Sequence, residues 1–258
     1  MNSEKSVRAS SLQNALRLLN LFSVEEPELG ISEIAGKMGI ANSTAHRLVT
    51  TLASEGFIAK NRNTNHYRLG ISILALSDIV TSMMDIHQVA LPVFHELSKN
   101  ANESVQLSVF RDDEVIFLTR IDCVRSIRSL HSMGSRAPAY CTCSGQVFLA
   151  DQPKETVDRI VKKGLVPFTE KTITDPGQLY ALLQKVRKQG YSINVQGFQE
   201  NVISIAAPIH NSAGKVIATV SIPGPVQRMS ESVLPQLTKM LIMAANEISQ
   251  RFQQFKDH

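Results

Sequence analysis

The chain has 258 residues, a formal net charge of +4 at pH 7 and three cysteines. This length suits two domains rather than one, the mild positive charge does not by itself indicate nucleic acid, and three cysteines cannot build a disulfide framework. No stretch as long as a membrane span is free of polar groups, and the N-terminus lacks the apolar core of a signal peptide. We therefore expect a cytoplasmic protein that does not enter a membrane.

The N-terminal part is expected to begin with a flexible arm at residues 1–10 and a helix over residues 11–22. A second, short helix is predicted over residues 32–38. Ser32 is placed to be the N-cap of this helix, because its hydroxyl can accept a hydrogen bond from a first-turn N–H group. Gly39 can adopt the left-handed conformation that ends it.

The next predicted helix, residues 41–55, has one apolar and one polar face at about 100° per residue. The polar face is rich in hydroxyl groups and contains no acid. Its residues, with His46 at the edge, are Ser43, Thr44, His46, Arg47, Thr50 and Thr51. Short donors and one long cation suit a helix that enters the major groove of DNA, so the two helices indicate a helix-turn-helix. An ordinary amphipathic pair, in which these residues only cap or solvate the helix, is the alternative.

A basic hairpin is predicted directly after this helix. Two short strands, residues 57–59 and 67–69, flank a polar tip, and Lys60, Arg62 and Arg68 lie on the hairpin. This order is typical of a winged helix-turn-helix domain, here over residues 11–70. Residues 40–70 carry an excess of three cations, so DNA binding should weaken steeply with salt. A solvated charged hairpin is the alternative.

A long helix with a broad apolar stripe is predicted over residues 71–91. Its place between two domains favours a linker that buries the stripe against a second subunit, because helix-turn-helix proteins commonly read twofold-symmetric sites as dimers. A helix within one domain is the alternative. Pro92 is expected to lie in the first turn of another helix, residues 92–99.

Residues 92–258 are predicted to form an α+β domain around a mainly antiparallel sheet, because strands at both ends enclose a run of helices. The domain is predicted to begin with a hairpin over 103–121, with its turn at Asp112–Asp113, then a weak strand at 127–130 and a loop at 133–138. Three helices follow, from about Ser144, over 153–163 and over 176–188, the last with Asp175 as its cap and Gly190 as its stop. Strands at 202–210 and 215–222 and a last helix over 231–255 complete it.

Cys141 and Cys143, with His131 and His210 elsewhere in the domain, form the one cluster with a possible chemical role. A zinc site needs about four ligands at recognisable spacing, and a thiolate nucleophile needs a base and an oxyanion site. The cluster is weak for both, so we expect no catalytic residue, no metal ligand and no cofactor. A metal- or redox-responsive regulator that uses these cysteines, and an enzyme with an attached DNA-binding domain, are the alternatives.

The sequence resembles the IclR family of bacterial transcription regulators over nearly its whole length. The resemblance is carried by ANSTAHRLVTTLASEGF with YRLG behind it, MGSRAPAYCTCSGQVFLA, GYSINVQGFQENVISIAAPI and GKVIATVSIPGP, in the family's order and spacing. It implies a homodimer or a dimer of dimers on palindromic double-stranded operator DNA. It also implies a C-terminal domain, related to GAF/profilin-like folds, that binds a small-molecule effector.

By position, the resemblance places an effector pocket between the loop before a short helix and the strands near the end of the domain. Its lining would be Cys143, Ser144, Asn194, Val202, Ser204, Ser221 and Pro223. Ser144 near a helix N-terminus suits a carboxylate. Family members that bind small keto acids usually have other residues at five of these places, including an acid at Asn194. The expected function is a repressor of a catabolic operon, controlled by a small anionic metabolite such as a sugar acid or an aromatic acid.

Overall fold

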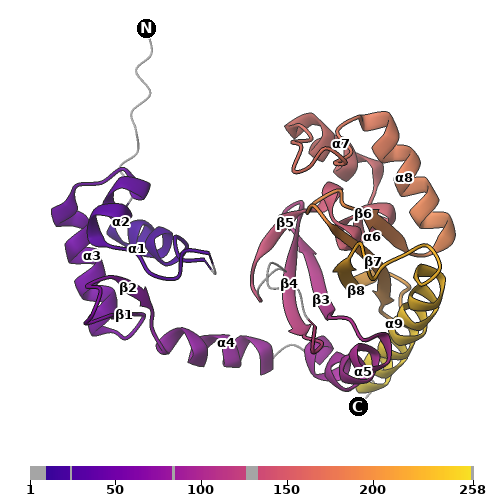
Figure 1. The fold of residues 1–258 in the computed structure, drawn as a ribbon, viewed down its shortest axis with the longest axis horizontal. Helices are drawn as coiled ribbons and strands as arrows, with labels where there is room; N and C mark the ends of the chain where they lie inside the picture. Colours follow the sequence, from indigo (N-terminus) through magenta and orange to yellow (C-terminus); the bar gives the residue numbers. More distant parts are fainter. Residues whose placement is uncertain (1–9, 24, 83–84, 126–132, 257–258) are drawn as a thin grey trace, which may run out of the picture. The chain divides into compact units, whose positions relative to one another are not determined.

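The computed structural model describes residues 10–23, 25–82, 85–125 and 133–256. The chain divides into two compact units, residues 1–83 and residues 84–258 (Figure 1). The predicted N-terminal arm, Ser10 apart, and the predicted strand at 127–130 lie outside the described residues. No helix of the described residues is long and apolar enough to cross a membrane.

The first unit is a small helical domain with a two-stranded hairpin. Its elements are α1 (Ser11–Leu19), α2 (Ile31–Met38), α3 (Asn42–Ser54), β1 (Ile58–Lys60), β2 (Tyr67–Leu69) and α4 (Ser72–Ser82). Four of these elements share one apolar core. Helices α1 and α2 contribute Leu18 and Ile34, α3 contributes Ala45 and Val49, and β1 contributes Ile58. The apolar face predicted for the helix-turn-helix is therefore the face that the fold buries.

The start of α2 differs from the prediction. Gly30, not Ser32, is the N-cap, and Glu33 Oε2 accepts a hydrogen bond from Gly30 N at 2.7 Å. A glutamate at the third helical position reaches back to the cap N–H, which fixes the helix start without a capping hydroxyl. Gly39 ends the helix in the left-handed conformation, with φ 65°, as predicted.

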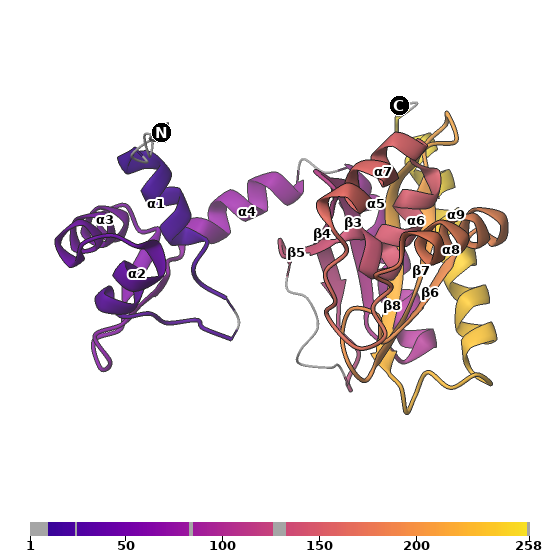
Figure 2. The ribbon, with the colours of Figure 1, turned by 90° about the horizontal axis from the view of Figure 1, so that it is seen from above.

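The second unit is an antiparallel sheet between two layers of helices (Figure 2). In the described residues the strand order is β5-β4-β3-β8-β7-β6, and every pair is antiparallel. The strands are β3 (Val105–Arg111), β4 (Glu114–Ile121), β5 (Arg136–Pro138), β6 (Ser192–Val195), β7 (Val202–His210) and β8 (Val216–Pro225). The α+β class with a mainly antiparallel sheet is confirmed.

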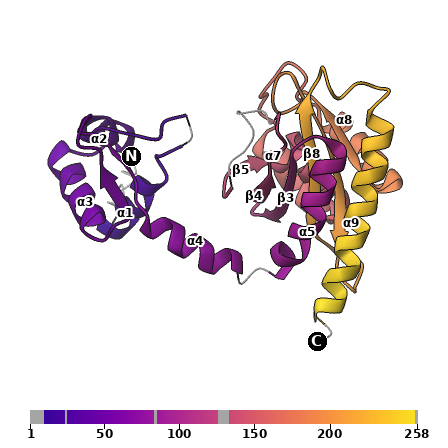
Figure 3. The ribbon, with the colours of Figure 1, turned by 60° about the horizontal axis from the view of Figure 1, so that its bottom comes forward.

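Each face of the sheet has its own apolar core. Helices α5 (Asp85–Ala101) and α9 (Leu234–Lys256) pack against each other and cover one face (Figure 3). The other face is covered by α6 (Cys143–Asp151), α7 (Lys154–Lys163) and α8 (Pro176–Gln189). Of these helices, α6 lies directly on the strands, and its first turn is where the predicted effector residues begin.

The predicted break before Pro92 is wrong. Helix α5 runs through Pro92, because Ala90, Val93 and Phe94 continue one buried face across it. A proline inside a helix costs about 3 kcal/mol, and burying several large apolar side chains offsets that cost. The described parts of the predicted helix 71–91 belong instead to α4 and to the first turns of α5.

Two strands were not predicted. Strand β5 lies within the predicted loop at 133–138, and β6 lies between the helix that ends at Gln189 and the predicted strand at 202–210. Both are too short to show an alternating pattern, and their strand conformation comes from pairing at the two sheet edges. Strand β8 also extends past Pro223. Its pairing with β3 covers only residues 219–221, so the missing N–H of Pro223 removes no hydrogen bond to β3.

Candidate DNA-binding surface and effector cavity

The predicted DNA-contacting residues of α3 lie on its solvent-facing side. Thr44 is half-buried, and the other predicted residues of this helix are exposed, whereas Ala45, Leu48 and Val49 are buried. This is the arrangement that the polar face of the helix predicted. The residues that the structure brings together on this face are Ser43, Thr44, His46, Arg47, Thr50 and Thr51.

The N-terminus of α3 has no side-chain cap. Its N-cap residue is Ala41, which has no capping group, so Ser43 and Thr44 do not act as the cap. Thr44 N donates to Ala41 O at 2.9 Å, and the N–H groups of Asn42 and Ser43 lie before any carbonyl of the helix that could accept them. Such N–H groups, together with the positive end of the helix dipole, suit a phosphate.

Two threonines of the polar face bond to their own helix. Thr50 Oγ1 donates to His46 O at 2.9 Å, and Thr51 Oγ1 donates to Arg47 O at 3.0 Å. Their hydroxyl lone pairs face outward as acceptors, and each hydroxyl must rotate before it can donate to a base or a phosphate. Arg47 is therefore the cation of this face that can donate without rearrangement.

The hairpin carries its cations as predicted, but an acid lies beside them. Asn61 Nδ2 donates to Glu28 Oε1 at 2.9 Å, and Thr64 Oγ1 donates to Glu28 Oε2 at 3.1 Å. The Asn61 hydrogen bond is the largest of the effects that hold the pKa of Glu28 below its usual value. Glu28 precedes Asn61 by 33 residues, so a charge count over residues 40–70 misses it.

The cations themselves are available to DNA. Among the described residues none of Lys60, Arg62 and Arg68 forms an ion pair, and all are exposed. Lys60 Nζ lies 5.8 Å from the centre of the Tyr67 ring, a distance at which the ring attracts a cation. Strand β2 is fixed from the other side by Leu29, which exchanges two hydrogen bonds of 2.9 Å with Tyr67.

The predicted effector residues surround one cavity in the second unit. All of them line a cavity of about 40 Å³ between the first turn of α6 and the strands β3, β7 and β8. They are Cys143, Ser144, Asn194, Val202, Ser204, Ser221 and Pro223. The lining also includes residues that sequence reasoning missed, namely Gln106, Phe117, Thr142, Phe198 and Gln199. Alternation along β3 could have indicated Gln106, because a buried polar residue stands there among apolar ones.

The start of α6 is held rigidly at the cavity wall. Thr142 is its N-cap, with Oγ1 accepting from Gly145 N at 3.1 Å. Gly145 is required because a Cβ there would lie 2.1 Å from Ala139 O. Gln146 donates to Tyr140 O at 3.2 Å and accepts from Ser192 Oγ at 2.6 Å, which ties the helix to the preceding segment and to β6.

Asn194 ties two walls of the cavity together. Its Nδ2 donates to Cys141 O at 2.9 Å, and its Oδ1 accepts from Gly197 N at 2.8 Å. A carboxylate at this position could accept from Gly197 but could not donate to Cys141. The asparagine therefore positions the segment before α6, and much of its hydrogen-bonding capacity is used within the protein.

The turn between β6 and β7 covers the cavity through Phe198 and Gln199. Thr172 Oγ1 donates to Gly197 O at 2.8 Å, and Thr169 Oγ1 donates to Gln196 O at 2.6 Å. These hydrogen bonds anchor the cover to the loop before α8.

No charged side chain of the described residues lines the cavity. Burial raises the pKa of the Cys143 thiol, with the Ser204 hydroxyl acting in the opposite direction, and burial raises the pKa of Cys141 to about 12. Both thiols are therefore neutral, and a neutral buried thiol is a poor nucleophile and a poor metal ligand. In the described part of the chain no three potential ligands gather as a metal site. His131 lies outside the described residues.

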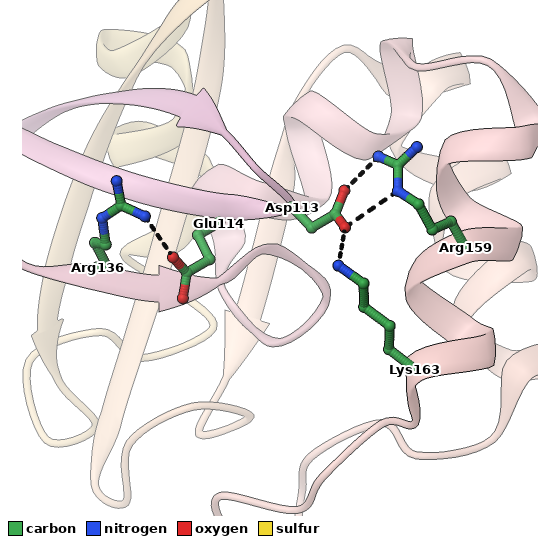
Figure 4. Close-up of polar contacts among 5 residues, drawn as sticks. All are labelled: Asp113, Glu114, Arg136, Arg159 and Lys163. Carbon is green, nitrogen blue, oxygen red and sulfur yellow. Dashed lines mark hydrogen bonds and ion pairs between the residues drawn. The ribbon is translucent and has the colours of Figure 1, made fainter. Parts of the chain in front are cut away.

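A charged cluster holds the hairpin β3–β4 against α7 (Figure 4). Asp113 accepts from Arg159 Nη2 at 2.5 Å and from Lys163 Nζ at 2.7 Å. The Arg159 hydrogen bond is the main reason that the pKa of Asp113 is lowered to about 2. Glu114 accepts from Arg136 Nη1 at 2.9 Å, which fastens β5 to β4. Strand β5 leads directly into the segment that precedes α6.

A winged helix-turn-helix unit joined to an α+β unit with a cavity defines a class of protein, the transcriptional regulator that responds to a small molecule. Two family models match the chain, the IclR helix-turn-helix domain over residues 11–62 and the bacterial transcriptional regulator IclR C-terminal domain over residues 79–250. The chain belongs to the IclR family of DNA-binding transcriptional regulators. It is accordingly a regulator and not an enzyme.

Three relatives illustrate the match. The regulator KipR of Bacillus subtilis is 31% identical, over 92% of this chain and 94% of its own length. The acetate operon repressor of Salmonella typhimurium is 26% identical, over 94% of this chain and 89% of its own length. A crystal structure of an IclR homologue from Microbacterium hydrocarbonoxydans, complexed with 4-hydroxybenzoate, is 28% identical with a TM-score of 0.82, and covers 95% of this chain and 99% of that one.

Proposed function

We propose that this protein represses a catabolic operon and that a small carboxylic acid, bound in the cavity at the start of α6, controls its affinity for the operator. The observation that carries the proposal is the cavity itself, where residues from α6, β7 and β8 meet. The Salmonella relative is named for the acetate operon and the Microbacterium relative binds 4-hydroxybenzoate, and both names support a carboxylic acid.

The acid would be held by neutral groups. The first turn of α6 offers N–H groups and the positive end of a helix dipole, and Ser144 adds a hydroxyl. Because the described lining has no cation, a carboxylate here depends on these oriented dipoles rather than on an ion pair.

DNA would be bound by the exposed face of α3 and by the hairpin. In this arrangement Arg47 and the small polar residues of α3 enter the major groove, and the uncapped helix N-terminus lies against a phosphate. Lys60, Arg62 and Arg68 contact the adjacent backbone. The proposal therefore needs positive charge only on α3 and the hairpin, which agrees with the small net charge of the chain.

We infer that the protein acts as a homodimer or a dimer of dimers. Helix α4 and the residue before it expose large apolar side chains, among them Ile71 at 80% and Leu74 at 65% exposure. Leu76, Ile79 and Val80 are each at least half exposed. Apolar side chains at this density are typical of an interface, and a second copy would give the two half-sites of a symmetric operator two identical readers.

Control follows from linkage. An acid that binds one arrangement of the dimer more tightly than another shifts operator affinity by that difference in free energy and by no more. The segment that joins the two units, α4 and α5, carries the coupling in this proposal.

Binding of DNA from the region upstream of the gene, measured by fluorescence anisotropy with and without a panel of sugar acids and aromatic acids, tests the proposal. We expect nanomolar binding that one acid changes at least tenfold. Binding that no acid changes would contradict control by a carboxylic acid, and the absence of binding would contradict the operator assignment.

A further inference from the structure

Gln106 has a buried amide without a partner. The residue lies on β3, is 3% exposed and lines the cavity, and its Nε2 has no hydrogen-bond partner among the described residues. Buried polar groups are nearly always hydrogen-bonded in native proteins, so an exception calls for an explanation. A group that enters the cavity is the natural partner for this amide.

A second buried polar group, without a strong partner, faces the same cavity from the side of α6. Ser144 Oγ is buried, its residue is 1% exposed, and the one group that the described residues place beside it for a hydrogen bond is the neutral Cys143 thiol, a weak partner. Ser144 is the second residue of α6, where first-turn N–H groups favour a negative charge. Gln106 pairs with Ser221 of β8, so it belongs to the sheet side of the cavity.

Apart from Asn194, whose amide already bonds within the protein, and Gln199 of the turn beside the cavity, the polar groups of the cavity form two sets. One is the first turn of α6, and the other is the sheet side with Gln106, Ser204 and Ser221. Apolar side chains, those of Phe117, Val202 and Pro223 among them, complete the described lining. A ligand with one carboxylate and an otherwise apolar body satisfies the first set and leaves the Gln106 amide unpaired.

We propose that Gln106 is a specificity-determining residue of the effector site. Its Nε2 donates a hydrogen bond to a second oxygen, a hydroxyl or keto group, of a small acid whose carboxylate lies at the first turn of α6. This inference rests on the proposed function and names the chemical class of its effector, a short oxygen-substituted carboxylic acid. The cavity, at about 40 Å³, is much smaller than the roughly 150 Å³ cavity that holds benzene, so it favours the smallest acids of this class, and a longer one would require the lining to move.

Matched pairs of acids that differ by one hydroxyl group test the proposal. Glycolate with acetate, lactate with propionate, and 3-hydroxybutyrate with butyrate are titrated calorimetrically into the full-length protein. We expect the protein to bind the hydroxylated member of at least one pair ten or more times more tightly, because a buried donor left unpaired by the other member opposes its binding.

Gln106→Leu removes the donor at nearly constant shape. The preference is expected to fall below about threefold in this variant, through weaker binding of the hydroxylated acid alone. Ser108→Ala is the control, because Ser108 lies on the same side of β3, is fully buried and also has an unpartnered hydroxyl, but does not line the cavity. Gln106→Asn keeps the amide and shortens its reach, so an intermediate preference is expected; it replaces the leucine variant if that one fails to fold.

Three outcomes overturn the inference. They are an unchanged preference in the Gln106 variants, an equal loss of preference in Ser108→Ala, and no binding of any pair by a protein that still binds its operator. The last result leaves the regulatory function intact and removes only the proposed effector class. Loss of operator binding by the unaltered protein would instead contradict the proposed function.

Discussion

Arg47 concentrates the positive charge of α3 in one exposed side chain. Arg47→Ala is expected to weaken specific operator binding by about 1–3 kcal/mol, because one arginine contact to a base or phosphate has that magnitude. Fluorescence anisotropy at fixed salt measures the effect. Arg17→Ala on α1 is the control, since it removes the same charge from an exposed helix position outside α3. Equal effects of the two substitutions would contradict the role given to Arg47.

Gln106 links binding to stability with opposite signs. Replacing its unpartnered amide by an apolar side chain of similar shape removes a desolvation cost of about 1–3 kcal/mol. Gln106→Leu is therefore expected to raise the melting temperature of the acid-free protein by several degrees, measured by calorimetry. A lower melting temperature would show that the amide has a partner within the folded protein.

The Asp113 cluster makes one hairpin turn sensitive to acid. Because the pKa of Asp113 in the folded protein is about 2, below its ordinary value of 3.8, the cluster stabilises fully above about pH 4 and loses its contribution as the pH falls toward 2. Asp113→Asn is expected to lower the free energy of unfolding by roughly 1–2 kcal/mol at pH 7, because solvent screens the half-exposed Arg159 and Lys163.

Urea unfolding at pH 7 and at pH 2 measures this difference, which should nearly vanish at the lower pH. Asp112→Asn is the matched control, because Asp112 is its neighbour in the same turn, is mostly exposed and has only a long contact of 3.7 Å to Arg111. Asparagine tolerates the positive φ of both positions, so neither substitution strains the turn. A pH-independent loss in Asp113→Asn would contradict the ion-pair explanation.

The elements that the sequence predicts well are those with many residues on one face. Helix α3 and strands β3, β4 and β7 repeat their apolar residues often enough to show the period, and Asp175 and Gly190 mark the limits of α8. Strands β5 and β6 are too short for any period and exist because a neighbouring strand pairs with them. The prediction at Pro92 was wrong because a proline disfavours a helix interior, whereas burial of the apolar face on both sides of it stabilises one continuous helix.

The residues of the cavity likewise divide into those that could be predicted from the sequence and those that could not. The resemblance to a known family supplied Cys143, Ser144 and Ser221, which the fold does bring together, and their part in binding stays a prediction. It did not supply Gln106, because its position depends on which face of β3 meets α6. Nor could it show that Asn194 already bonds to Cys141 and Gly197, since those contacts join segments distant in sequence.

Operator affinity of the whole molecule should depend steeply on salt. The logarithm of the binding constant falls with the logarithm of salt concentration by about 0.9 for each phosphate contact. Arg62→Ala removes one exposed hairpin cation per subunit, so the slope of a dimer is expected to decrease by about 1.8. Lys188→Ala on α8, an exposed cation of the second unit, should leave the slope unchanged. An unchanged slope in Arg62→Ala would place the hairpin away from DNA.

The exposed stripe on α4 predicts how the protein assembles. Leu74→Glu introduces a charge where we expect a second subunit to cover the side chain, and it should shift the protein toward monomers in sedimentation velocity. Val166→Glu, at a similarly exposed position of the second unit, is the control. If both variants sediment like the unaltered protein, the stripe does not form the subunit interface.

The anchored turn beside the cavity also bears on how quickly the proposed acid could bind and leave. If the acid enters beside Phe198, the turn has to move, which requires breaking the hydrogen bonds that Thr169, Thr172 and Asn194 make to Gln196 and Gly197. Association that waits for such an opening is slower than a diffusional encounter. The same hydrogen bonds would also slow the release of a bound acid, so the proposed complex should last longer than one of equal affinity at an open site.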